Sequence, residues 1–97
     1  MKNFDEVVSK ISEVYHPAIN HSLIKLGIVQ DIELLDDSVI LTFVFPFPNI
    51  PIADNLISSV EKPIMDMGLS LEYIVRIMND QERARFLQLE AEAWKGL

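Results

Sequence analysis

The side chains with metal-binding chemistry are two histidines and a set of nearby carboxylates. His16 and His21 are the only imidazoles in the sequence. Together with Asp31, Asp36 or Asp37 they provide the nitrogen and oxygen donors of a metal site, which would support a metal-dependent enzyme. Histidines five positions apart across a proline do not share a helix face. We therefore favour the interpretation that His16 ends a helix, that His21 lies in a loop, and that both contact water.

Other reactive groups are missing from the sequence. It contains no cysteine, which excludes disulfides, thiolate zinc sites, a cysteine nucleophile and thiolate ligation of an iron–sulfur cluster by this chain alone. No serine lies in a nucleophile-elbow motif, and there is no glycine-rich phosphate loop. We predict that the protein is not an enzyme and that it has no catalytic, cofactor-binding or metal-binding residues.

A proline-rich segment offers a different kind of site. Residues 46–51 read PFPNIP, and the three prolines fix three φ angles and remove three backbone donors. The loop is therefore stiff and acts through its shape and side chains. Phe47 and Ile50 would present an apolar contact to a partner protein; the alternative is that both fold inward and fill the core. The candidate partner-binding residues are Pro46, Phe47, Pro48, Asn49, Ile50, Pro51 and Asp54.

Length and charge limit the class of protein. The 97 residues, 49% of them hydrophobic, predict a single domain over residues 1–97 with one core. A formal net charge of −7 argues against nucleic acid and anionic membranes as partners. The first residues, MKNFDEVV, are too acidic for a signal peptide, and the apolar run VILTFVF is too short to span a bilayer. These features predict a cytoplasmic protein.

Hydrophobic periodicity predicts the elements that position the loop. Apolar residues three or four apart indicate a helix from Phe4 to about His16, where Pro17 ends it. Alternation over residues 28–35 indicates a half-buried strand. Its predicted inner face holds Ile28, Ile32 and Leu34, and its outer face holds Asp31 and Glu33.

A hairpin turn and a central strand come next. Asp36, Asp37 and Ser38 predict the turn, and residues 39–45 are apolar on both faces, as expected of a central strand. After the proline loop, a second apolar stripe predicts a helix with Pro51 in its first turn and Gly68 after its end. Pro63 is expected to kink this helix or to break it in two.

The last two elements are a strand and a helix. Residues 69–78 alternate, so Arg76 would meet Asp31 or Glu33 if their strands were close. Asn79 and Glu82 have the spacing of a capping box, which predicts a helix at about 80–95. Its apolar stripe, which includes Phe86, Leu89, Ala93 and Trp94, either packs on the chain's own sheet or forms a homodimer.

The order helix, strand, strand, helix, strand, helix predicts a two-layer α+β domain. A hairpin followed by a crossover gives a small mixed sheet, with the helices stacked on one side.

The sequence resembles a known family. Leu26, Gly27 and Val29 fit a Leu-Gly-x-Val motif, and Pro48 and Pro51 fit a proline pair that opens the second helix. These matches, with the hairpin, resemble the small iron–sulfur cluster assembly domain over about Phe4 to Ile77. That domain stands alone in SufT-like and PaaD-like proteins and forms the N-terminal part of Mrp-type ATPases. The segment after Ile77 differs from the family's tail.

This chain departs from the family pattern where the family carries its chemistry. His16, Pro17 and Ala18 replace an Asp-Pro-Glu-like step, and Pro46 and Phe47 replace two threonines. Ile50 aligns with the family's reactive cysteine, whose thiolate a helix N-terminus would favour. The resemblance therefore implies a cysteine-less, non-catalytic accessory or adaptor protein of iron–sulfur cluster assembly. Its partner would be a scaffold, an ATPase or a client protein; the alternative is a general dimerising interaction module.

Overall fold

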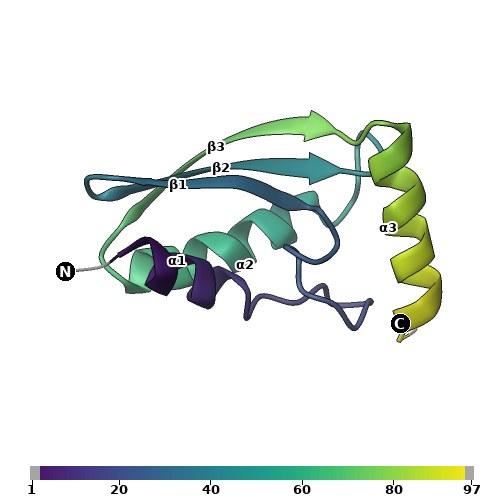
Figure 1. Ribbon diagram of the computed structural model, residues 1–97, viewed down its shortest axis with the longest axis horizontal. Coiled ribbons are helices and arrows are strands. Elements are labelled where there is room, and N and C mark those ends of the chain that lie inside the picture. Colours follow the sequence, from purple (N-terminus) through teal and green to yellow (C-terminus); the bar gives the residue numbers. More distant parts are fainter. Residues whose placement is uncertain (1–2, 96–97) are drawn as a thin grey trace.

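The computed structural model describes residues 3–95 and has the predicted α+β fold (Figure 1). The elements follow one another in the predicted order, helix, strand, strand, helix, strand, helix. They are α1 (Phe4–Ile11), β1 (Val29–Leu35), β2 (Ser38–Phe45), α2 (Ala53–Asp66), β3 (Ser70–Ile77) and α3 (Asp80–Ala93). Within the described residues, no helix is long and apolar enough to span a membrane.

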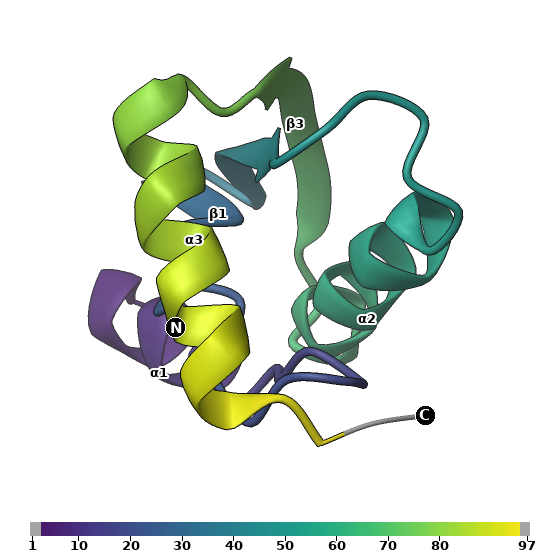
Figure 2. The same ribbon diagram turned by 90° about the vertical axis from the view of Figure 1, so that its right-hand side faces the viewer.

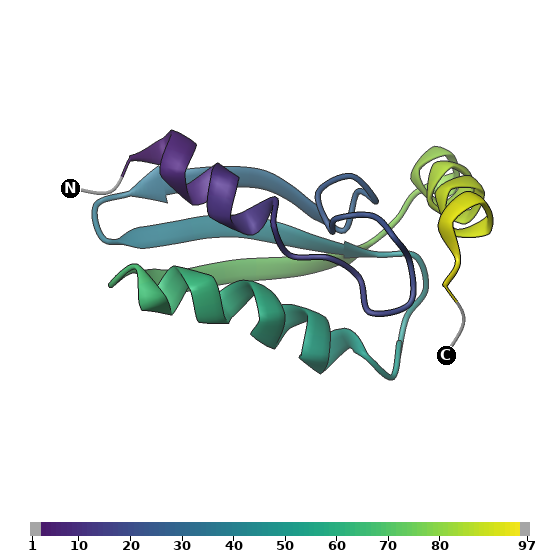
Figure 3. The ribbon, with the colours of Figure 1, turned by 90° about the horizontal axis from the view of Figure 1, so that it is seen from below.

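The sheet is mixed, and β2 is its central strand, as predicted. β1 and β2 pair antiparallel, whereas β2 and β3 pair parallel in a regular register. Cα partners in a sheet project their side chains to the same face, so the pairings Val39↔Leu71 and Phe43↔Val75 define one apolar face. The helices α1 and α2 cover one face of the sheet (Figure 3). The fully buried side chains of Val39, Leu41 and Phe43 form the centre of the core.

The helix α2 is continuous through Pro63, so the predicted break does not occur. Pro63 cannot donate to the carbonyl of Ser59, but Ser59 is exposed and water can bond to that carbonyl. Val60 and Ile64 on either side of the proline are fully buried, and their packing holds the helix together. α2 begins at Ala53, so Pro51 precedes the helix and does not occupy its first turn.

The first helix is shorter than predicted, because α1 ends at Ile11 and not near His16. The Val14 backbone N–H bonds to the Ile11 carbonyl at 3.0 Å in a tight turn. Val14 then accepts a hydrogen bond from the Leu23 N–H at 3.0 Å. Pairing with a later segment therefore ends the helical geometry before Pro17 is reached.

A bulge in β1 overturns the predicted alternation of that strand. The register shifts between Gln30 and Glu33, and Asp31 adopts a left-handed conformation with φ 55°. The extra residue changes the side-chain parity, so Val29 lies on the inner face with Leu34, and Ile28 lies on the opposite face.

The last helix has the predicted capping box but not the predicted position. The Glu82 N–H donates to the Asn79 side chain, and the Asn79 N–H donates to Glu82. α3 crosses the end of the sheet and does not stack beside α1 and α2 (Figures 1 and 2).

Candidate functional site

An apolar pocket lies where the proline loop faces α3. It is bounded by the loop, the start of α2, α3 and the segment after α1, which Figure 2 shows arranged around one end of the molecule. Its volume is about 480 Å³. We call it the loop pocket, and its lining consists of His16, Ala18, Ile28, Phe45, Pro46, Phe47, Pro48, Asn49, Ile50, Pro51, Ile52, Leu56, Phe86, Glu90 and Trp94.

The loop contributes six consecutive residues, 46–51, to the lining. Pro46 is buried, and the Phe47 side chain is 48% exposed. Ile50 is partly buried and packs against the core. The sequence left open whether Phe47 and Ile50 are exposed to a partner or fill the core. In the structure Phe47 faces outward, whereas Ile50 turns inward. Asp54 is exposed on α2 and lies outside the lining.

Arg83 of α3 fixes the beginning of the loop. Its Nε donates to the Pro46 carbonyl at 2.8 Å, and its Nη2 donates to the Met78 carbonyl at 2.8 Å. The guanidinium carbon lies 5.6 Å from the centre of the Phe47 ring, a cation–π geometry. Because the prolines leave the loop short of backbone donors, the carbonyl of Pro46 is bonded by a donor from outside the loop, the Arg83 Nε–H.

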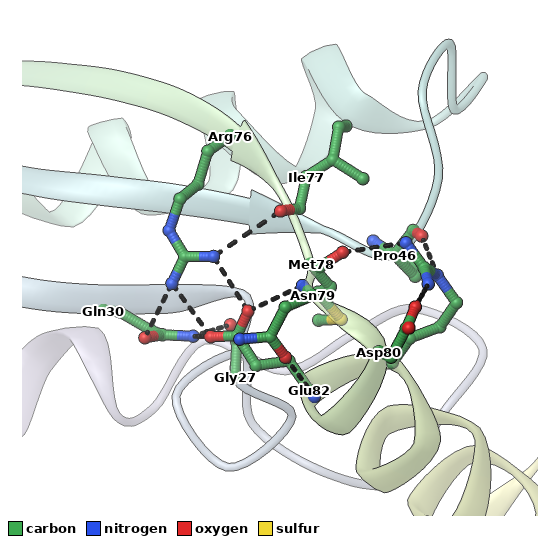
Figure 4. A network of polar contacts seen from close by, with 10 residues as sticks. Gly27, Gln30, Pro46, Arg76, Ile77, Met78, Asn79, Asp80 and Glu82 are labelled. Atoms are coloured by element: carbon green, nitrogen blue, oxygen red, sulfur yellow. Dashed lines mark hydrogen bonds and ion pairs between the residues drawn. The ribbon is translucent and has the colours of Figure 1, made fainter.

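A network around Glu82 holds the N-terminal end of α3 against the sheet (Figure 4). Arg76 of β3 donates to both Glu82 carboxylate oxygens at 2.8 Å, and the Gln30 amide donates to one of them at 3.0 Å. Hydrogen bonds from Arg76, from the Asn79 N–H and from Gln30 hold the pKa of the Glu82 carboxyl well below its usual range. The contact of Arg76 with Asp31 or Glu33, expected if their strands were close, does not form among the described residues. β2 separates β1 from β3, and Arg76 reaches β1 at Gln30, where its Nη2 donates to the side-chain oxygen at 3.4 Å.

Backbone pairing holds the other end of α3. The Asn20 N–H donates to the Ala93 carbonyl, and the Lys95 N–H donates to the Ala18 carbonyl, both at 2.9 Å. An isolated β-bridge joins Ile19 to Trp94. The pocket wall formed by α3 is thus fixed at both ends.

His16 is buried in the lining of the loop pocket, so the prediction that it contacts water is wrong. Its side chain is 7% exposed, and its Nδ1 accepts the Ala18 N–H at 3.0 Å. Burial, and secondarily the charge of Lys95, lowers the pKa of the His16 imidazole. His21 is partly buried.

The carboxylates named as metal-ligand candidates are not gathered around these histidines. Among residues 3–95 there is no group of three or more His, Cys, Asp or Glu side chains in a position to hold a metal ion. The structure therefore does not assemble His16 or His21 with Asp31, Asp36 or Asp37.

The structure combines two features that the sequence presented separately. The proline loop and the apolar stripe of the last helix line the same pocket, where Phe86 is buried and Trp94 is 55% exposed. Sequence reasoning missed Arg83, although a loop with three missing donors was a signal that it needed outside donors. It also missed Ala18, which carries no chemical signal of its own.

Comparisons with known proteins give a family and a fold. A family model described as iron–sulfur cluster assembly protein matches residues 5–69. A crystal structure of a domain of unknown function, DUF59, from Bacillus anthracis is similar with a TM-score of 0.62 and 17% sequence identity. The similarity covers 88% of this chain and 89% of that one, and at this identity it shows the fold alone. No curated protein matches the sequence.

Proposed function

Because the chain belongs to the iron–sulfur cluster assembly protein family, we propose that it is a non-catalytic accessory or adaptor protein of that pathway, in the manner of SufT-like and PaaD-like proteins. Its partner is an assembly scaffold, an ATPase or a client protein, and it acts in the cytoplasm. The observation that carries the proposal is the loop pocket, an apolar surface built around the position of the family's reactive residue.

The chain's own residues do not fit an iron–sulfur cluster. Clusters are held by cysteine thiolates, with histidine as an occasional replacement. The sequence has no cysteine, and Ile50 stands where the family carries its reactive thiol. We therefore assign the cluster to the partner, as cargo, and assign to this chain the recognition of that partner.

The loop pocket has the features of a protein-binding surface. Phe47 and Trp94 line the pocket and are both about half exposed, and exposed aromatic side chains at a pocket are frequent anchors of interfaces. The prolines and Arg83 hold the loop rigidly, so binding loses little conformational entropy. Glu90 lines the pocket, and the chain carries a net charge of −7. The partner should therefore insert an apolar side chain flanked by a basic one.

Affinity capture from native lysate tests the pathway and the surface together. The wild-type chain should recover cluster-assembly components, and Phe47→Asp should lose them because it places a carboxylate at the mouth of the pocket. Leu35→Asp is the matched control, since Leu35 is an exposed apolar residue at 61% that lies on β1, outside the pocket lining. Equal recovery by both variants would reject the loop pocket. Recovery of no assembly component by the wild type would favour the general dimerising module.

Anaerobic reconstitution with iron and sulfide tests the division of roles. We expect the purified chain to retain no cluster after desalting, because it has no thiolate to hold one. A stable iron–sulfur absorption band in the purified chain would show that it carries the cluster itself, and the adaptor role would be wrong.

Trp94 provides a direct binding assay for any captured partner. It is the only tryptophan in the sequence, and it lines the pocket. Addition of a partner that enters the pocket should change the Trp94 fluorescence of the wild type and of Leu35→Asp, but not that of Phe47→Asp. A partner without tryptophan, or one labelled separately, keeps the signal specific to this chain.

A further inference from the structure

The strand β3 forms an open apolar edge of the sheet. It is the outer strand in the order β1-β2-β3, and Figure 1 shows it along the border of the sheet. Four of its large hydrophobic side chains are at least 40% exposed: Tyr73 at 43%, Ile74 at 67%, Val75 at 49% and Ile77 at 40%. An exposed hydrophobic edge strand is a template for pairing with another strand.

The two edges of the sheet differ in how they are protected. The other edge strand, β1, is interrupted by the bulge at Asp31, which distorts its backbone and disfavours pairing with an added strand. β3 pairs with β2 in an uninterrupted register from Ser70 to Ile77, and it contains neither proline nor lysine. β3 therefore has no proline, lysine or bulge to block pairing, and its two charged side chains are those of Glu72 and Arg76.

The direction of the backbone groups shows which residues of β3 are open to a partner. The N–H groups of Ser70 and Met78 donate toward β2, to the Asp37 and Phe45 carbonyls at 2.9 and 2.8 Å. Backbone groups alternate along a strand, so the even-numbered residues of β3 bond to β2 and the odd-numbered ones point outward. Those outward residues are Leu71, Tyr73, Val75 and Ile77. Within the described chain, the one hydrogen bond to their backbone groups is a 3.5 Å contact from Arg76 Nη1 to the Ile77 carbonyl.

We propose that a second copy of this chain pairs with β3 in antiparallel orientation, about a two-fold axis at Ile74. In this register Tyr73 faces Val75 of the other copy, and Leu71 faces Ile77. These are outward-pointing residues on both strands, so each facing pair exchanges two N–H···O bonds, about eight in total. The result is a continuous six-stranded sheet, which removes the open edge.

Charge selects this register over its neighbours. Centring the two-fold axis on Ile74 places Glu72 of each copy opposite Arg76 of the other, which gives two complementary pairs. Centring it on Glu72 or on Arg76 places like charges directly opposite each other, and centring it on Tyr73 or Val75 places both charges opposite uncharged side chains. Arg76 bonds to Glu82 through its two Nη atoms. Its Nε–H makes no hydrogen bond within the described residues and remains available to Glu72 of the other copy. Self-complementarity of this kind fits a second copy of the same strand.

A single introduced cysteine tests the pairing and the register. Because the sequence has no cysteine, Ile74→Cys carries one thiol per chain. Ile74 would face its own copy in a non-hydrogen-bonded pair with a Cα separation of about 4.5 Å, which lies within the range of disulfides. Mild oxidation should therefore link this variant into a dimer on a non-reducing gel. Leu35→Cys is the matched control, with an equally exposed site on β1, and it should link far less. Equal yields from the two variants would overturn the proposal.

Sedimentation of the unmodified chain gives an independent test. The wild type should form a concentration-dependent dimer. Val75→Pro removes only an outward N–H, so the β2–β3 ladder is kept; two lost bonds per dimer should weaken association about 10-fold to 100-fold. Glu72→Arg changes an exposed side chain and places arginines opposite each other, so it should weaken the dimer without changing the fold. A wild type that stays monomeric, or a dimer that neither variant weakens, would show that the edge does not pair in this way.

Discussion

Replacement of Arg83 by alanine should release the proline loop and destabilise the protein more than any neighbouring surface change. Arg83 donates to two backbone carbonyls, those of Pro46 and Met78, at 2.8 Å each. Pro46 is buried and is the first residue of the loop, while Met78 links β3 to α3. The side chain therefore joins three elements that meet at the pocket, and its removal leaves two carbonyls without their donors.

The size of the effect follows from the kind of bond. A hydrogen bond from a charged donor contributes about 1.5–3 kcal/mol, and the side chain of Arg83 is 27% exposed. Water can partly replace the lost donors, so the lower end applies and the two bonds amount to about 2–4 kcal/mol. The ion pair with the fully exposed Asp80 adds nothing measurable. A domain of this length has a stability of roughly 5–15 kcal/mol, so the variant should fold but should be clearly weakened.

Urea denaturation followed by Trp94 fluorescence and by circular dichroism measures this loss. With an m-value near 1.5 kcal/mol per molar, the midpoint should fall by about 1–3 M. Arg85→Ala is the matched control, because Arg85 lies on the same helix, is exposed, and undergoes the same change in helix propensity. Arg83→Lys should give an intermediate loss, since an ammonium cannot reproduce the planar fork. If Arg83→Ala lowers the midpoint no more than Arg85→Ala does, the arginine does not hold the loop.

The other predictions concern pH and backbone conformation. The pKa of Glu82 is depressed in the folded state, so its contribution to stability is complete above the unfolded-state pKa of about 4.3 and is lost as the pH falls below that value. The urea midpoints of the wild type and of Glu82→Gln should therefore converge in acid. A difference between the two midpoints that does not change with pH would show that the network does not stabilise the fold. The lowered pKa of His16 means that the unfolded state binds the proton more readily, so stability should fall as the pH drops through the ordinary imidazole value of 6.5. His16→Asn should flatten the dependence of the urea midpoint on pH near pH 6. An unchanged slope would show that His16 does not cause this dependence. Gly68 has φ +79° and open space around a Cβ, so Gly68→Ala should cost about 1–2 kcal/mol from backbone strain alone, with Gly68→Asn costing less in the same denaturation assay.

Part of the fold could be predicted because some elements carry their signal within a few neighbouring residues. Residues 39–45 are apolar on both faces, and that pattern correctly indicated the central strand. The pair Asn79 and Glu82 indicated the start of the last helix, since the capping box depends only on residues three apart. Both features are local, and neither requires knowledge of what packs against them.

The errors arose where distant segments decide the conformation. α1 ends early because Val14 pairs with Leu23, and His16 is buried in a segment whose next residues, 18–20, pair with the end of α3. The bulge at Asp31 has no proline or glycine to mark it, since an aspartate adopts φ 55° there. Periodicity within one segment contains no information about such contacts. It therefore predicts a first helix that continues to His16 and a His16 side chain in contact with water.

Contacts between distant segments also limit how much of this protein the family assignment explains. The family model matches residues 5–69, which include the proline loop but not α3. The groups that fix the loop and complete its pocket, Arg83, Phe86 and Trp94, all lie beyond the match. The matched region therefore includes α1, β1, β2, the proline loop and α2, whereas α3 and its C-cap supply three of the fifteen residues that line the loop pocket. If the loop pocket binds a partner as we propose, we expect partner choice to depend on α3, and relatives that share only the matched region should not bind the same partner.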